Sequence, residues 1–301
     1  MLNLPLPPDY RIQDVLQFHG RDPQSPAERV TANRIVRAFS HAGRACHIEL
    51  TLSPGQALAT GDGPAATLEA VARRLLGLRC RVEEFQERYH QHPVLGPLIA
   101  ARPGLRIHEQ VSLFEALTWA IMGQQVNLAF ALKLRRRWIA LAGLCHCSGL
   151  YCYPEPAAVA SLEPDQLRQQ QFSQAKARTL VSFAREVVEG RIDLEQSPEQ
   201  LAPLLLQHKG IGPWTVHYAL LRGCAYADAS LHGDAAVRRA LQRLLGRPLN
   251  PVETENWLLD FRPHRSLAAA HLWASLRGSE PDTVSSSSAV AEPETRHPSL
   301  S

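Results

Sequence analysis

The segment with the clearest chemical potential is a short turn between two apolar stretches, Lys209-Gly210-Ile211-Gly212-Pro213. Two glycines around one apolar residue allow a tight turn with positive φ angles. Pro213 favours the first position of a second helix, where its missing N–H costs no hydrogen bond. The N–H groups of the turn and of the new helix then point outward together, at the positive end of the helix dipole. This pattern predicts a site for an anion such as a phosphate group.

A glycine-x-glycine turn also occurs in ordinary helix–helix connections, so the surrounding residues must distinguish the two interpretations. Here the pattern extends over residues 205–223, as L-x-x-x-x-G-I-G-x-W-T-x-x-Y-x-L-x-x-G. This longer string resembles the helix-hairpin-helix of the DNA base-excision glycosylases. It is most similar to that of 3-methyladenine DNA glycosylase II, the AlkA family.

The resemblance extends over about residues 5–276, with further segments in the same order and at similar spacing. It implies the family's fold and a partner, double-stranded DNA that contains damaged bases. The matching segments are 10–18 with Arg21, 101–106, 120–126, 231–238 and 262–273.

A glycosylase breaks a C1′–N bond through a transition state with oxocarbenium character. A carboxylate near C1′ stabilises that positive charge and can orient or deprotonate the attacking water. The resemblance gives this catalytic role to Asp234, in the string Asp-Ala-Ala-Val-Arg. An aspartate directly before a helix is also a common N-cap, and capping would draw the carboxylate toward the helix amides. We expect the catalytic role.

Glycosylases with this hairpin that also cut the strand carry a lysine two residues after the second glycine, which forms a Schiff base. In this chain that position is Trp214, and Lys209 precedes the hairpin, where it is expected to face solvent or phosphate. The resemblance therefore implies a monofunctional enzyme. Water is then the nucleophile, and an abasic site is the product.

The target base has to leave the duplex, so the enzyme needs a pocket with aromatic faces. Trp214 and Tyr218 are four residues apart and share one face of the second hairpin helix, although core packing would give the same spacing. The resemblance adds Phe18 and Gln124 to the pocket. Electron-rich rings suit an alkylated purine, because methylation at N3 or N7 makes the base cationic.

Two positions depart from the family pattern. His264 replaces a pocket tryptophan before Arg-Ser on the last helix, and it is expected to line the pocket as a weaker stacking wall. Gln125 stands where an apolar wedge usually fills the gap left by the extruded base, and it can hydrogen-bond the orphaned partner. Activity on deaminated or oxidised bases, or binding of damaged DNA without chemistry, therefore remain alternative functions.

Few side chains suggest a cofactor. No cysteine follows Asp234, so the iron–sulfur cluster of many hairpin glycosylases is not expected. Cys145-His146-Cys147, with Cys152 nearby, lacks a paired C-x-x-C and is interpreted as free thiols and not as a zinc site. The resemblance implies a monovalent cation at the hairpin, held by three backbone carbonyls. The matching carbonyls are those of Leu206, His208 and Ile211.

The remaining patterns predict the elements that position these residues. Residues 34–39 and the alternating 46–52 predict an antiparallel hairpin, with helices over 12–21 and 65–78. From about residue 83 onward the apolar spacing is helical, and Gly123 is a plausible break in the long 113–142 stretch. The other expected helices are 83–90, 164–170, 174–189, 198–208, 213–223, 235–245 and 266–276.

We therefore expect an α+β fold. Residues 1–110 form a small antiparallel-sheet-plus-helix domain with a linker, and residues 111–277 form an all-α helix-hairpin-helix body in two helical subdomains. Residues 278–301 contain a serine run and few large apolar residues, which predicts a disordered tail.

The composition limits the classes of protein to which the chain can belong. With 45% hydrophobic and 20% charged residues, most of the 301-residue chain is expected to fold, and no apolar run is long enough to span a membrane. The chain carries +3 and the predicted tail −3, which leaves a mildly basic, arginine-rich body compatible with a phosphate partner. A monomer in the cytoplasm, associated with the nucleoid if the cell is bacterial, is expected.

Overall fold

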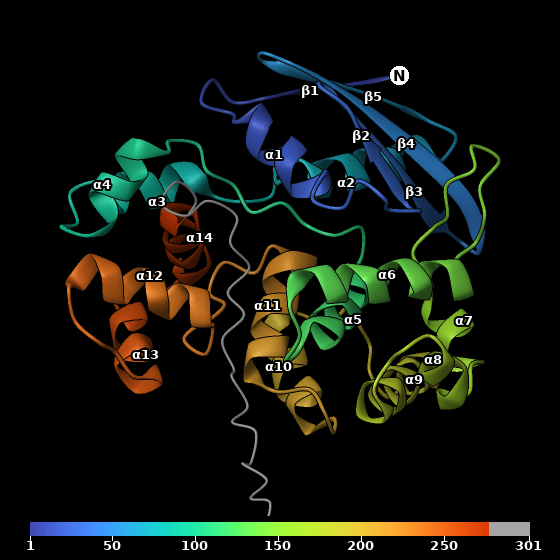
Figure 1. Cartoon of the computed structure of the whole chain (residues 1–301). Helices are drawn as coiled ribbons and strands as arrows, with labels where there is room; N and C mark the ends of the chain where they lie inside the picture. The colour runs from blue at the N-terminus through green and yellow to red at the C-terminus, as the bar shows by residue number, and fades with distance from the viewer. Residues whose placement is uncertain (277–301) are drawn as a thin grey trace, which may run out of the picture.

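The computed structural model describes residues 1–276 (Figure 1). The predicted tail, residues 278–301, lies outside the described residues. Within the described part, no helix is both long enough and apolar enough to cross a membrane.

The N-terminal region forms a five-stranded antiparallel sheet in the order β1-β5-β4-β3-β2. The predicted hairpin is confirmed as β3 and β4, where Ile35 pairs with Leu50 and both side chains are fully buried. Helices α1 and α2 supply the other side of this small core. The bounds are β1 Leu2–Pro5, β2 Glu28–Val30, β3 Arg34–His41, β4 Arg44–Ser53, β5 Gln56–Gly61, α1 Ile12–His19 and α2 Ala65–Leu75.

Most of the remaining described chain is helical, as the spacing predicts. The long apolar stretch divides at the expected place, because α5 ends at Gly123 and α6 begins at Leu128. The short helices α4, α7 and α13 were not predicted. The bounds are α3 Val82–Tyr89, α4 Leu95–Ala101, α5 Leu113–Gly123, α6 Leu128–Ala142, α7 Pro156–Ala160, α8 Pro164–Gln169, α9 Gln174–Val188, α10 Pro198–Gln207, α11 Pro213–Cys224, α12 Ala235–Leu245, α13 Pro251–Leu259 and α14 Arg265–Leu276.

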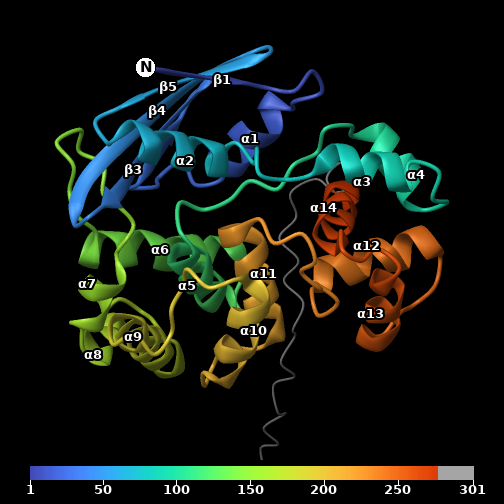
Figure 2. The ribbon, with the colours of Figure 1, turned by 180° about the vertical axis from the view of Figure 1, so that it is seen from behind.

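The helices form two hydrophobic cores on either side of α11 (Figures 1 and 2). One core contains α5 to α10 and the face of α11 that carries Val216 and Leu220. The other contains α3, α4 and α12 to α14, together with Leu221 of α11. This arrangement confirms the predicted α+β fold with two helical subdomains. Residues 82–101, which precede residue 110, share the second of these cores.

The contact between α11 and α5 depends on a glycine. A Cβ added to Gly223 would lie 2.7 Å from the Cα of Leu113, which is closer than a real Cβ contact. The two helices therefore approach at backbone distance near the C-terminal end of α11. This close packing fixes α11 against the first helical core.

Four buried charged side chains join the sheet to the helical body. Arg37 of β3 lies between Glu28 of β2 and Glu115 of α5 and makes an ion pair with each. Arg135 of α6 contacts the same two carboxylates, each at 3.2 Å. Although burial acts in the opposite direction, Arg37 and Arg135 hold the pKa of Glu28 well below its usual range. These four side chains have no net charge, because two are positive and two are negative.

Replacing Glu115 by Gln should lower the free energy of unfolding by roughly 3 kcal/mol, because two buried arginines would then face one carboxylate. Chemical denaturation of the full chain measures this change. Glu69→Gln is the matched control, since Glu69 pairs with Arg73 on the exposed face of α2 and should cost less than about 1 kcal/mol. Equal effects of the two substitutions would contradict the role assigned to the buried cluster.

Candidate active site

Asp234 lies at the N-cap of α12, and it accepts four hydrogen bonds from N–H groups. Its Oδ1 accepts from the backbone amides of Ala236 and Val237, both at 2.9 Å. The indole N–H of Trp214 donates to Oδ2 at 2.9 Å, and that of Trp273 donates to Oδ1 at 3.1 Å. The carboxylate is therefore both a helix cap and a group held between two indole rings, and the expected conflict between these roles does not arise.

The two indoles belong to an aromatic cluster formed by Trp214, Tyr218, Trp273 and Phe18. Trp214 and Tyr218 stack on one face of α11, as their spacing predicts, with ring centroids 5.2 Å apart. Trp273 of α14 meets Tyr218 edge to face at 6.2 Å. Rings from both sides of the site thus lie directly beside the Asp234 carboxylate.

Phe18 of α1 brings the N-terminal domain into this cluster. Its ring has the guanidinium of Arg21 at 4.3 Å and that of Arg222 at 4.6 Å, and Arg222 also lies 5.5 Å from the Trp273 ring. A cavity of about 40 Å³ is lined by Phe18, Arg222 and Trp273 among others. This volume is only slightly larger than the space that one water molecule occupies in the liquid.

The structure does not place His264 in the aromatic cluster, so this part of the predicted pocket is wrong. His264 is 3% exposed and packs near Phe85 and Tyr89, with its Nε2 3.3 Å from a Glu84 carboxylate oxygen. A helix turns by about 100° per residue, so positions nine residues apart face opposite sides. The last helix brings Trp273 to the Asp234 carboxylate, and the sequence marks Trp273 only as part of a matching segment.

The hairpin turn between α10 and α11 forms as predicted, except that Gly210 has a positive φ and Gly212 does not. Gly210 has a φ of +94°, and a Cβ there would lie 2.3 Å from Oγ1 of Thr179. Ile211 is 4% exposed and packs into the first helical core. Gly212 is the N-cap of α11, Pro213 follows as its first residue, and Lys209 is exposed. The start of α11 therefore lies at the surface with its amides uncovered by a capping side chain.

Gln124, which the resemblance assigns to the pocket, is hydrogen-bonded to the hairpin and to the first turn of α11. Its Nε2 donates to the Gly210 carbonyl at 3.0 Å and to Oγ1 of Thr215 at 2.8 Å. Lys176 donates to the carbonyls of Met122 and Gln124, both at 2.8 Å. The bend between α5 and α6 is thus fastened to the hairpin.

Gln125 occupies the exposed position of this bend. Its φ is +54°, in the left-handed region that non-glycine residues rarely adopt. Gln125 is thus exposed at the bend, and its role as the wedge stays a prediction.

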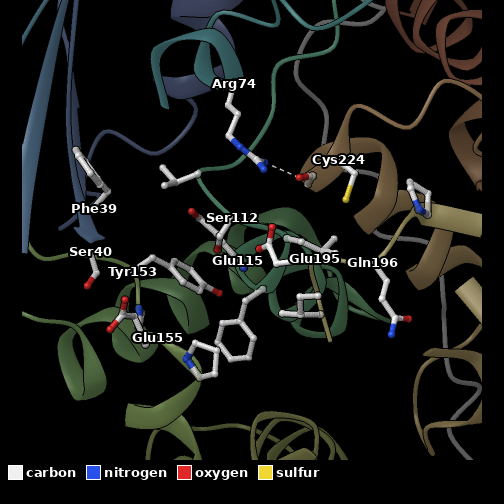
Figure 3. A pocket seen from close by; sticks show the side chains of 18 of the residues that line it. Phe39, Ser40, Arg74, Ser112, Glu115, Tyr153, Glu155, Glu195, Gln196 and Cys224 are labelled. Carbon is white, nitrogen blue, oxygen red and sulfur yellow. Dashed lines mark hydrogen bonds between the residues drawn. The ribbon is translucent and has the colours of Figure 1, made fainter. Parts of the chain in front are cut away.

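A larger cavity lies elsewhere. It has a volume of about 520 Å³ and lies between the sheet domain and the helices, with Arg74, Ser112, Glu115, Tyr153 and Cys224 in its lining (Figure 3). Neither Asp234 nor any ring of the aromatic cluster lines it. The candidate active site is therefore the aromatic cluster with Asp234.

Comparison with known proteins agrees with this geometry. Residues 118–260 match the family model of the HhH-GPD superfamily base excision DNA repair proteins, and residues 1–112 match the AlkA N-terminal domain. The chain is 33% identical over 222 residues to DNA-3-methyladenine glycosylase 2 of Escherichia coli strain K12, covering 72% of this chain and 77% of that protein. The chain belongs to the HhH-GPD superfamily.

Solved structures share the fold of this HhH-GPD chain. The 3-methyladenine DNA glycosylase of Archaeoglobus fulgidus superposes with a TM-score of 0.81 and 24% identity, over 93% of this chain and 99% of that one. The 8-oxoguanine glycosylase/lyase of Clostridium acetobutylicum, in complex with double-stranded DNA, gives 0.71 and 14%, over 89% and 91%. The resemblance inferred from the sequence is confirmed at the level of family and fold.

Gly210→Ala should destabilise this HhH-GPD protein by about 1–3 kcal/mol, because the new Cβ meets Thr179 and the φ angle is unfavourable. Gly190→Ala is the control, since Gly190 also has a positive φ of 75° but open space around its Cβ position. Thermal unfolding of both variants separates the steric effect from the dihedral effect. A Gly210 variant no less stable than the Gly190 variant would contradict the assigned packing.

Proposed function

We propose that the protein is a monofunctional DNA N-glycosylase that releases alkylated purines of the 3-methyladenine type and leaves an abasic site. The observation that carries this proposal is the Asp234 carboxylate, held by two indole N–H groups beside the aromatic cluster. Family membership supports the same reaction class. Such a substrate would locate the protein on chromosomal DNA, in the nucleoid if the cell is bacterial.

Asp234 supplies the electrostatic part of the mechanism. As the base leaves, positive charge develops at C1′ and O4′ of the sugar, and a nearby carboxylate stabilises it. The four N–H donors hold the carboxylate in one orientation, so little reorganisation is needed when the charge appears. The same group can orient or deprotonate the water that attacks C1′.

The aromatic cluster supplies the recognition surface for the extruded base. The faces of Trp214, Tyr218 and Trp273 attract a cationic alkylated purine through cation–π interactions. Such a base is also a good leaving group, so the site needs little acid catalysis. Excision of 3-methyladenine therefore requires no further proton donor in this part of the molecule.

One observation favours the second candidate, activity on deaminated or oxidised bases. Two guanidinium groups, of Arg21 and Arg222, already lie against Phe18. They reduce the attraction of that ring for a cationic base. A neutral base with carbonyl oxygens would not be repelled by them.

We propose that the hairpin carbonyls bind a monovalent cation. The Leu206 carbonyl lies in the last turn of α10, where helix carbonyls lack helical partners. The His208 carbonyl accepts from the Ile211 amide at 3.1 Å and keeps a second lone pair. With Ile211 as the third donor, the bound cation would add positive charge next to a DNA phosphate. No iron–sulfur cluster is proposed, since the sequence after Asp234 contains no cysteine.

Asp234→Asn should retain the fold, because asparagine also caps helices, and should lower base release by about 10²–10³-fold. Duplexes that each carry one defined lesion, alkylated, deaminated or oxidised, measure which base is liberated and how fast. Asp165→Asn, on the exposed face of α8, is the control and should be fully active. Near-normal excision by the Asp234 variant, with its fold intact, would remove this residue from the mechanism.

Borohydride should trap no covalent enzyme–DNA species during turnover. The position that would carry a Schiff-base lysine holds Trp214, whose N–H is bonded to Asp234. Gel analysis with a bifunctional hairpin glycosylase as positive control tests this expectation. A trapped adduct would show that an amine attacks C1′ and that the reaction is not simple hydrolysis.

A further inference from the structure

Residues 225–233 connect the end of α11 to Asp234, so the path of this connection determines where the carboxylate lies. The connection is bound to α14, which shares the second helical core with α12 (Figures 1 and 2). Leu231 is fully buried in that core, and its carbonyl accepts from the Asp234 amide at 2.9 Å. Only His232 and Gly233 lie between the buried leucine and the aspartate. The place of Asp234 is therefore tied to the buried part of the connection.

Ser266, in the first turn of α14, makes three hydrogen bonds to this connection. Its hydroxyl donates to the Tyr226 carbonyl at 2.6 Å and accepts from the Ala229 amide at 3.1 Å. The Ser266 amide donates to the Ala227 carbonyl at 2.9 Å. Ser266 is fully buried, so these bonds are shielded from solvent. One residue of α14 thus fixes three residues of the connection.

Arg265, the first residue of α14, fixes the residue that lies between these contacts. Its Nε donates to Oδ1 of Asp228 at 2.6 Å, and its Nη2 donates to Oδ2 at 2.8 Å and to the Asp228 carbonyl at 2.9 Å. Such a forked contact fixes orientation as well as distance. From α11, Nδ1 of His217 accepts from the Ser230 amide at 3.3 Å, and burial lowers the pKa of His217, which favours this neutral acceptor. Two helices therefore hold the connection.

The face of α14 that carries Ser266 meets the connection again at its end. Ser266 and Trp273 are seven residues apart, about two helical turns, so they lie on one face roughly 10 Å apart along the axis. Trp273 donates to Oδ1 of Asp234 at 3.1 Å. One helix therefore sets the distance between the anchored start of the connection and the carboxylate at its end.

We propose that Ser266 is a positioning residue for base release, which sets the place of the Asp234 carboxylate from the first turn of α14. This role rests on the proposed function, in which the carboxylate faces C1′ of the extruded nucleotide. Without the Ser266 hydroxyl, the Tyr226 carbonyl and the Ala229 amide lose a buried partner, and the connection shifts to satisfy them. A displacement of about 1 Å at a catalytic group can lower a rate roughly 100-fold.

Ser266→Ala should lower the single-turnover rate of base release by about 10- to 100-fold and leave the affinity for the same lesion-bearing duplex unchanged. The affinity is preserved because the hydrogen bonds of Ser266 do not involve the hairpin. Ser275→Ala is the matched control and should keep the wild-type rate, since the Ser275 hydroxyl donates to the Leu272 carbonyl of its own helix at 2.7 Å.

Arg265→Lys provides a second test if Ser266→Ala does not fold. Lysine keeps the positive charge beside Asp228 but cannot make the forked contact. The rate of base release should again fall while the affinity for the duplex stays the same. A folded Arg265→Lys protein with the wild-type rate would contradict the role assigned to the start of α14.

The indole N–H signals in a proton–nitrogen correlation spectrum report the place of the carboxylate without any reaction. Ser266→Ala should shift the signals of Trp214 and Trp273, which donate to Asp234. The signal of Trp257, which packs against the same helical core, should stay in place. Unshifted Trp214 and Trp273 signals, or a wild-type rate, in folded Ser266→Ala would overturn the proposal. A wild-type protein that releases no base would instead contradict the proposed function, and the indole signals would still decide whether Ser266 positions the carboxylate.

Discussion

The position of α11 is the constraint on which the rest of the structure depends. Its C-terminal end is pressed against α5 at Gly223, where a side chain would meet the backbone of Leu113. Its N-terminal end starts at the hairpin, and the half-buried Trp214 and Tyr218 lie on its face toward the second helical core. One helix therefore sets the distance between the surface that is proposed to hold DNA and the rings proposed to hold the base. The buried charge cluster around Arg37 and Glu115 keeps α5 itself in register with the sheet.

The hydrogen bonds by which Asp234 caps α12 also fix the carboxylate that is proposed for catalysis. Capping normally directs an aspartate into its own helix, and here Oδ1 does accept the first amides of α12. Two indoles, one from α11 and one from α14, donate to the same carboxylate, Trp214 to Oδ2 and Trp273 to Oδ1. The capping bonds restrict rotation of the side chain. The indole N–H groups fix the orientation of the lone pairs that remain. Both effects favour a carboxylate that is fixed before the substrate arrives.

Local patterns predicted those features that depend on residues close in sequence. The alternation in β4, the break at Gly123 and the shared face of Trp214 and Tyr218 all follow from spacing along one element. The edge strands β1 and β2 have only four and three residues, which is too short for alternation to predict a strand. A match along the sequence cannot separate His264 from Trp273, because it does not show which side of α14 faces the site. The contact of Ser266 with the Tyr226 carbonyl, 40 residues apart, depends on tertiary packing that no local pattern encodes.

The small cavity beside Phe18 and Trp273 has a consequence for the way lesions are selected. A purine is larger than a space of about 40 Å³, so a base that enters between Phe18 and Trp273 has to displace Arg222 or one of the rings. A poorly paired or poorly stacked nucleotide spends more time outside the duplex, which lowers the free energy needed to extrude a damaged base. The side chains of the protein and the stability of the duplex would then act together in the choice of base.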